Sequence, residues 1–166
     1  EVNMTLKLND IRALQNQLDE HIMANHQVTR PQTRIRRILA LMVEIGELAN
    51  ETRTFKFWSF KKASEKEVLL EELGDCVHFA VSLGIDLEDN TAELEFIERE
   101  ASLSDQFIDW MSETATLKTQ FTLDQYKLVL SYIGSIALAM GFGADDVYDF
   151  YIKKNEINHS RQDHQY

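Results

Sequence analysis

Apolar residues recur at intervals of three and four along most of this chain, and this period constrains the fold more than any other feature. Such spacing places the apolar side chains on one face of an α-helix. Helix breakers are scarce, with one proline and six glycines among 166 residues, so the pattern favours long helices over a turn-rich β fold. A chain of this length fits one domain. We therefore expect a single all-α domain over residues 1–166.

The periodic stretches predict about six helices packed as a bundle. Ser64 and Thr122 are each followed three residues later by glutamate or glutamine, the pattern of a capping box, and Gly84 has the place of a C-terminal glycine. No stretch predicts a strand. The expected helices cover about 6–26, 31–53, 64–84, 90–111 (interrupted near 102–104), 122–141 and 144–159.

Charge and cysteine usage narrow the class of protein. The net charge of −11 argues against nucleic-acid binding, because a phosphate backbone attracts a basic surface. The single cysteine, Cys76, excludes an intrachain disulfide, suits a reducing cytoplasm, and lies in an apolar stripe as a core residue would. No apolar run is long enough to span a membrane, and the first residues lack the order of a signal peptide. We expect a cytoplasmic protein that binds neither nucleic acid nor membrane.

Two acidic pairs occupy positions where the helical period places apolar side chains. Glu44 and Glu47 lie in the second predicted helix, and Glu72 and Asp75 lie in the third. Residues three apart are neighbours on a helix surface, and the short 55–63 connection permits the two helices to pack antiparallel, which would bring both pairs together. Carboxylates gathered in this way stay ionised only beside a cation, and oxygen ligands favour Mg²⁺ or Mn²⁺ over Zn²⁺.

The alternative to a metal site is that these acidic residues are solvated, as a single acidic pair on a helix usually is. Two pairs within apolar stripes on consecutive helices favour a metal site between the second and third helices. A di-iron bundle is disfavoured, because that design uses Glu-x-x-His pairs.

Two further segments have alternative interpretations. The loop 55–62 interleaves aromatic and basic residues. It could be a platform for a nucleobase or an apolar plug between two helices. A membrane-surface segment is less favoured, because the chain is acidic.

Lys154, Asn158 and Arg161 are spaced by four and three, so one helical face could bind phosphate. The alternatives for them are favourable cations at a helix C-terminus or a frayed tail. Surface polarity is an adequate explanation of Gln15 and Asp19 by themselves.

Four stretches, in the same order, resemble the dimeric all-α dUTPase family, a branch of the all-α nucleoside triphosphate pyrophosphatases that includes MazG-like proteins. They are LQNQLDEHI, LMVEIGELANETRTFKFWSFKKAS, EVLLEELGDCVHFAVSLG and YIKKNEINHSRQ. The combination of E-x-x-E, FKFW, E-x-x-D and K-N-x-x-N-x-x-R-Q is specific, whereas residues 86–122 carry no matching motif. One departure from the family pattern is Gln165 at the C-terminal lid, where a glycine is common.

The resemblance implies a homodimer that hydrolyses dUTP, and dUDP, to dUMP with Mg²⁺, or with Mn²⁺ in its place. Glu47 is the predicted base that accepts a proton from the attacking water. The other implied roles are metal ligation by Glu44, Glu47, Glu72 and Asp75, phosphate binding by Lys154, Asn158 and Arg161, and base or sugar binding by Gln15, Asp19, Trp58 and His78.

Two other functions are alternatives to this one. The first is a sister pyrophosphatase with another base preference, either for dCTP or of the broader MazG-like kind. The second is a non-catalytic helical interaction module that uses the aromatic side chains of the 55–62 loop as contacts. Stabilisation by Mg²⁺ separates the module from the enzymes, since a module needs no carboxylate quartet.

Overall fold

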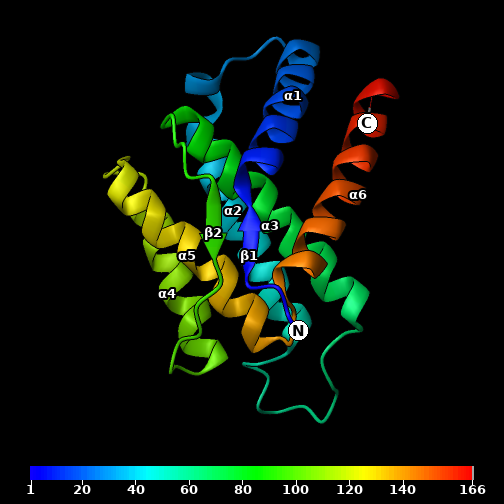
Figure 1. Cartoon of the computed structure of the whole chain (residues 1–166), viewed down its shortest axis with the longest axis vertical. Helices are drawn as coiled ribbons and strands as arrows, with labels where there is room; N and C mark the ends of the chain where they lie inside the picture. The colour runs from blue at the N-terminus through cyan, green and yellow to red at the C-terminus, as the bar shows by residue number, and fades with distance from the viewer. Residues whose placement is uncertain (166) are drawn as a thin grey trace.

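The computed structural model describes residues 1–165 and is helical along most of that length (Figure 1). It confirms the predicted all-α bundle of about six helices. A short two-stranded ribbon accompanies the helices. The elements are β1 (Thr5–Lys7), α1 (Leu8–His26), α2 (Arg30–Thr52), α3 (Lys66–Asp86), β2 (Glu93–Glu95), α4 (Leu103–Thr116), α5 (Leu123–Ala139) and α6 (Ala144–Asp163).

Helix α2 is delimited by local chemistry at both ends. The Thr29 hydroxyl accepts a hydrogen bond from the backbone of Gln32, while the Gln32 side chain accepts one from the backbone of Thr29. This capping box satisfies two amide groups that the first helical turn leaves unpaired. Arg53 then ends the helix in the left-handed conformation, with φ of 58°, which turns the chain into the loop that leads back to α3.

Helices α2 and α3 pack antiparallel, as predicted. Near the start of α2, Arg37 donates to Asp86 at the end of α3, with 2.7 Å between Nη2 and Oδ2. Near the end of α2, Glu51 accepts a hydrogen bond from the hydroxyl of Ser64, just before α3. Because residue numbers rise along one helix while their partners fall along the other, the acidic pairs of both helices lie at the same level.

Helix α3 occupies the centre of the bundle, where it packs against α1, α2, α5 and α6. Most of its residues are buried, and Cys76 within it has no exposed surface. This confirms Cys76 as a core residue. A helix enclosed on several sides is held firmly by its neighbours, so the backbone that carries the acidic residues of α3 is a rigid part of the fold.

The segment between α3 and α4 differs from the sequence prediction. Residues 90–102 do not form a helix, because 93–95 pair as β2 with β1 in an antiparallel ribbon, Thr5 opposite Glu95 and Lys7 opposite Glu93. Exposed and buried positions alternate here, with Phe96 buried between exposed neighbours, which is the period of a strand. The prediction that no strand forms is therefore wrong, and the first helix begins at Leu8 because the residues before it are extended.

Two other predicted helix ends are also wrong. Ser64 does not cap α3, because its hydroxyl bonds to Glu51 instead. Gly84 does not end α3, which continues to Asp86. A Cβ at position 84 would overlap the hydroxyl of Tyr126, so this glycine is needed for close packing of α5 on α3. That hydroxyl donates to the carbonyl oxygen of Ala80 at 2.9 Å.

The last two helices follow the prediction more closely. The Thr122 hydroxyl caps α5 by accepting from the backbone of Gln125, but the Gln125 side chain bonds to Glu113 on α4, so only half of the predicted capping box forms. Helix α6 continues to Asp163, past the predicted end at residue 159. Arg161 is therefore part of the same helix as Lys154.

Among residues 1–165, no single helix has the length and apolar character needed to cross a membrane. Only the pair α5 and α6 passes such a test together, by length and composition alone, and the two helices are bent by 111° at the break between them.

Candidate active site

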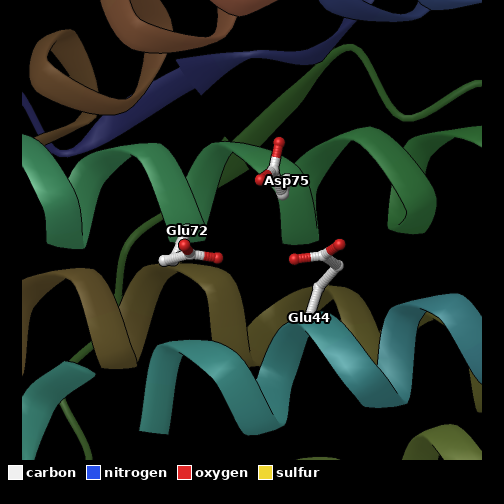
Figure 2. Close-up of side chains that lie close together, drawn as sticks. All are labelled: Glu44, Glu72 and Asp75. Atoms are coloured by element: carbon white, nitrogen blue, oxygen red, sulfur yellow. The ribbon is translucent and has the colours of Figure 1, made fainter. Parts of the chain in front are cut away.

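Three carboxylates from α2 and α3 converge inside the bundle. Glu44 reaches from α2 toward Glu72 and Asp75 on α3 (Figure 2). One oxygen from each residue lies within 4.8 Å of the oxygens of the other two, and all three side chains are partly buried. The spacing of three within α3 and the antiparallel packing of the helices together produce this cluster, which contains three of the four carboxylates that the sequence predicted.

Burial and mutual repulsion strongly disfavour the ionised forms of this cluster. The pKa of Glu44 rises from 4.5 to about 8, first because of burial and then because of the negative charge of Asp75. Burial, followed by the charge of Asp75, raises the pKa of Glu72 to about 7. Burial also raises the pKa of Asp75, although the positive charge of Lys154 opposes the shift. The cluster therefore needs positive charge to be fully ionised at neutral pH.

The free oxygens of the cluster fit a hard metal ion. Oε2 of Glu44 and Oε2 of Glu72 are buried and have no hydrogen-bond partner within residues 1–165. A buried carboxylate oxygen without a partner is costly, and a cation between these helices would satisfy both oxygens and remove the repulsion. Only oxygen atoms are offered, a donor set that suits Mg²⁺ or Mn²⁺. The residues present therefore fit a divalent metal.

Glu47 lies at the edge of the cluster. It is exposed and is not one of the three residues whose oxygens converge. Its carboxyl group nevertheless raises the pKa of both Glu44 and Glu72, so it is close to both. Glu47 therefore lies between the cluster and solvent.

A cavity of about 210 Å³ opens beside the carboxylates and joins α1, α2, α3 and α6. It brings Asn158 and Arg161 of α6 next to the acidic side chains, as the predicted phosphate-binding face requires. The sequence interpretation did not single out the other apolar and amide side chains at its wall. The lining residues are Ile22, Glu44, Asp75, His78, Phe79, Asn158, Arg161 and Gln162.

A larger cavity of about 470 Å³ lies next to this one, between the C-terminal ends of α1 and α6. Gln162 contributes to the walls of both cavities. None of the three converging carboxylates lines the larger cavity. Chemistry that depends on the carboxylates therefore belongs to the smaller one.

Lys154 is on α6, and its ammonium group points to carboxylates of α3. Lys154 does not line the cavity. Its ammonium nitrogen is 3.0 Å from Oε1 of Glu71 and 3.5 Å from Oδ1 of Asp75. Burial lowers the pKa of Lys154, but the hydrogen bond that it donates to Glu71 and the negative charge of Asp75 outweigh burial, so the net shift is upward. The sequence analysis did not identify Glu71. Its position four residues before Asp75 could have indicated that both lie on one face of the helix.

Gln15 and Asp19 are buried, at 0% and 4% exposure, so surface polarity is the wrong explanation for them. The Tyr151 hydroxyl donates to Oε1 of Gln15 at 2.7 Å, and Nε2 of Gln15 donates to Asp19 at 2.9 Å. Asp19 in turn accepts from the Ser82 hydroxyl and from Arg30. The pair is thus part of a buried hydrogen-bond network and does not line the cavity.

His78 lies at the cavity wall, close enough to Asp19 for the charge of Asp19 to affect its pKa. It lines the cavity wall and is only 9% exposed. Burial lowers its pKa, although the negative charge of Asp19 opposes this shift. A neutral imidazole at the wall can both donate and accept a hydrogen bond.

The loop between α2 and α3 projects from the bundle at the end opposite the C-terminus of α6 (Figure 1). Trp58 is 64% exposed, and Phe57 and Phe60 are exposed still further. The interpretation of this loop as an apolar plug is therefore wrong for these three side chains. Trp58 is also absent from the cavity lining, so within this chain it does not contact the predicted site.

Fold and site together define an all-α protein with a carboxylate centre that can hold a divalent metal. The sequence model of the dUTPase family matches residues 7–166, which is nearly the whole chain. The chain belongs to the dUTPase family and is a dUTP diphosphatase, a nucleoside triphosphate pyrophosphohydrolase. No curated protein sequence matches it.

Proposed function

We propose that the protein, acting as a single domain over residues 1–166, hydrolyses dUTP and dUDP to dUMP with Mg²⁺, or with Mn²⁺ in its place. The convergence of Glu44, Glu72 and Asp75 beside a cavity edged by Asn158 and Arg161 carries this proposal. Anionic substrate oxygens and anionic protein oxygens meet here, and they are compatible only with cations between them.

The residues in and around the cluster have different roles in the proposed reaction. A divalent ion held by Glu44, Glu72 and Asp75, with Glu47 as the fourth predicted ligand, would neutralise phosphate charge and make the attacking water more acidic. Glu47, at the solvent side of the cluster, accepts the proton of that water as a general base. Lys154, Asn158 and Arg161 bind phosphate oxygens, and the two cations stabilise the charge that develops on the leaving phosphate.

Selection of the nucleoside involves one residue of α3 and two residues of α1. In this proposal His78, which lines the cavity wall, contacts the deoxyribose, and Gln15 and Asp19 contribute to the uracil pocket through the buried network. A pocket too tight for a methyl group rejects thymine by steric clash. A contact between Trp58 and the base requires either movement of its loop or delivery of the loop by a second copy of the chain.

The proposed assembly is a homodimer in the cytoplasm, free of nucleic acid and membrane. Ile35, Leu39 and Val43 follow one another at intervals of four along α2 and are 56%, 60% and 50% exposed. An apolar stripe of this kind favours burial against a partner. Sedimentation should then give a mass of twice 19.3 kDa, whereas a monomer over the working concentration range would refute the dimer.

The substrate is tested with a panel of deoxynucleoside triphosphates and dUDP in Mg²⁺, by measuring release of pyrophosphate or phosphate. We expect turnover of the two uracil nucleotides and little of the others. Broad turnover would instead identify a sister pyrophosphatase of dCTP or MazG-like preference. No turnover of any nucleotide with Mg²⁺ present would favour the non-catalytic interaction module.

The raised pKa values of the cluster predict how stability depends on pH and metal. Without metal, the folded protein holds protons on Glu44 and Glu72 that the unfolded chain releases near 4.5. Stability from these groups is therefore lost as pH rises from 4.5 toward 8. Because Mg²⁺ binds the ionised forms, its stabilising effect should grow over the same interval.

The measurement is the melting temperature in EDTA and in Mg²⁺ at a series of pH values. In EDTA the loss of stability with rising pH should be smaller for Glu44→Gln, which cannot ionise at that position, and Mg²⁺ should stabilise this variant less than the parent. Equal pH slopes and equal Mg²⁺ effects for the two proteins would refute the assignment.

A further inference from the structure

Glu71 is an acidic side chain next to the carboxylate cluster that no step of the proposed reaction uses. It lies on α3, four residues before Asp75, so the two residues share one face of the helix. Oε1 of Glu71 accepts a hydrogen bond from Nζ of Lys154 on α6 at 3.0 Å. The Glu71 side chain is 52% exposed, and Glu71 is not one of the three converging residues.

Lys154 is held between two anions that differ in exposure. Its side chain is only 11% exposed, and its ammonium group is also 3.5 Å from Asp75, whose side chain is 20% exposed. A largely buried ammonium group needs a nearby counter-ion. In the absence of substrate, Glu71 makes the shorter of the two contacts and is the main hydrogen-bond acceptor for Lys154.

A polyphosphate chain at this site would compete with Glu71 for the same ammonium group. Phosphate oxygens accept hydrogen bonds from lysine and carry more negative charge than one carboxylate. They would also repel Glu71, whose negative charge already raises the pKa of Glu72 and Asp75. Because half of its side chain is exposed, Glu71 can turn into water at little cost, whereas the more buried Asp75 cannot.

We propose that Glu71 is a displaceable counter-ion that occupies Lys154 until substrate phosphate replaces it. The inference rests on the proposed role of Lys154 in phosphate binding. Glu71 thereby keeps the buried ammonium group paired and oriented in the empty site, and it reduces affinity for phosphate by having to be displaced. It is a positioning residue and does not touch the reacting atoms.

Removing the Glu71 charge should strengthen phosphate binding. Glu71→Gln keeps the size of the side chain and is expected to bind inorganic pyrophosphate about two- to fivefold more tightly, the effect of one partly exposed ion pair. Calorimetry in EDTA at low salt measures this without metal or turnover. The dUTP assay should show KM lowered by a similar factor with kcat little changed, a split that damage to the fold would not produce.

Matched variants separate displacement from a general loss of negative charge. Glu67→Gln removes the same charge one turn earlier from an exposed position on α3 and should leave pyrophosphate affinity within twofold of the parent. In a Lys154→Met background, the effect of Glu71→Gln should disappear, since the two residues act as one pair.

The proposal is overturned if Glu71→Gln binds pyrophosphate no more tightly, or if Glu67→Gln binds it as tightly as Glu71→Gln does. It also fails if neither the parent nor Glu71→Gln binds pyrophosphate measurably, because a released Lys154 must attract phosphate. Failure of the proposed function has a different result, in which the parent hydrolyses no nucleotide while the pyrophosphate affinities still follow the predicted order.

Discussion

Glu44→Gln and Asp75→Asn should each lower kcat for dUTP by about a thousandfold, which corresponds to about 4 kcal/mol of lost transition-state stabilisation. Each substitution keeps the size of the side chain and removes one negative charge from the cluster. In both, a metal ion would lose a charged oxygen ligand, and the site would lose its means of balancing substrate phosphate. Steady-state kinetics at saturating Mg²⁺ measures the effect.

Stability measurements distinguish this effect from unfolding. Without metal, both variants should be at least as stable as the parent protein at neutral pH, because each removes one of the carboxylates that repel one another. Asp109→Asn, at an exposed position on α4, is the matched control and should retain full activity. A kcat within tenfold of the parent for both cluster variants would contradict the metal-site assignment.

Asp86→Asn is expected to reduce the free energy of unfolding by about 3–5 kcal/mol, the usual result of breaking a buried ion pair. The Asp86 side chain has no exposed surface. It accepts hydrogen bonds from three guanidinium groups, with the shortest contact, 2.7 Å, to Arg37. An amide would leave three arginines in the first part of α2 without the counter-ion that they share at the end of α3.

The same ion pairs make a contribution to stability that depends on acidity. Burial alone would raise the pKa of Asp86, but hydrogen bonds from Arg37, Arg34 and Arg30 outweigh it, so its pKa is below 3.8. The stabilisation is therefore present above that pH and is lost as pH falls through the depressed pKa. Asp86→Asn should lose this acid-dependent contribution.

Denaturant unfolding at neutral pH measures the loss for Asp86→Asn, with Asp109→Asn as the control because it removes an equal charge from an exposed position on α4. The control should stay within about 0.5 kcal/mol of the parent. A loss of less than 1 kcal/mol for Asp86→Asn would show that the arginine cluster contributes little to stability.

Local pattern predicted the helices because their apolar faces repeat within one segment. The same method missed the β1–β2 ribbon, since Thr5 pairs with Glu95 and neither strand has enough residues to show a period alone. It also misplaced the end of α3 at Gly84, because the reason for that glycine is Tyr126 on α5. Contacts between distant segments decided each of these features.

In the candidate site, too, local spacing predicted some features, whereas contacts between distant segments decided others. The spacing of Glu72 and Asp75, together with the reversed direction of α2 and α3, was sufficient to predict that these residues meet Glu44. It did not show that Glu47, the fourth predicted ligand, lies at the exposed edge of the cluster. Pairing of Lys154 with Glu71 depends on how α6 crosses α3, which no local spacing specifies. Burial of Gln15 likewise depends on Tyr151, 136 residues further along the chain.

The position of α6 has a consequence for protein synthesis. Translation proceeds from the N-terminus, so α2 and α3, with their carboxylates, leave the ribosome before α6 is made. The acidic half of the site can therefore assemble on an unfinished chain, whereas Lys154, Asn158 and Arg161 arrive only with α6. Because α6 must return to pack on α1 and α3, the emerging chain carries carboxylates that can hold metal before it carries the cations proposed to hold substrate.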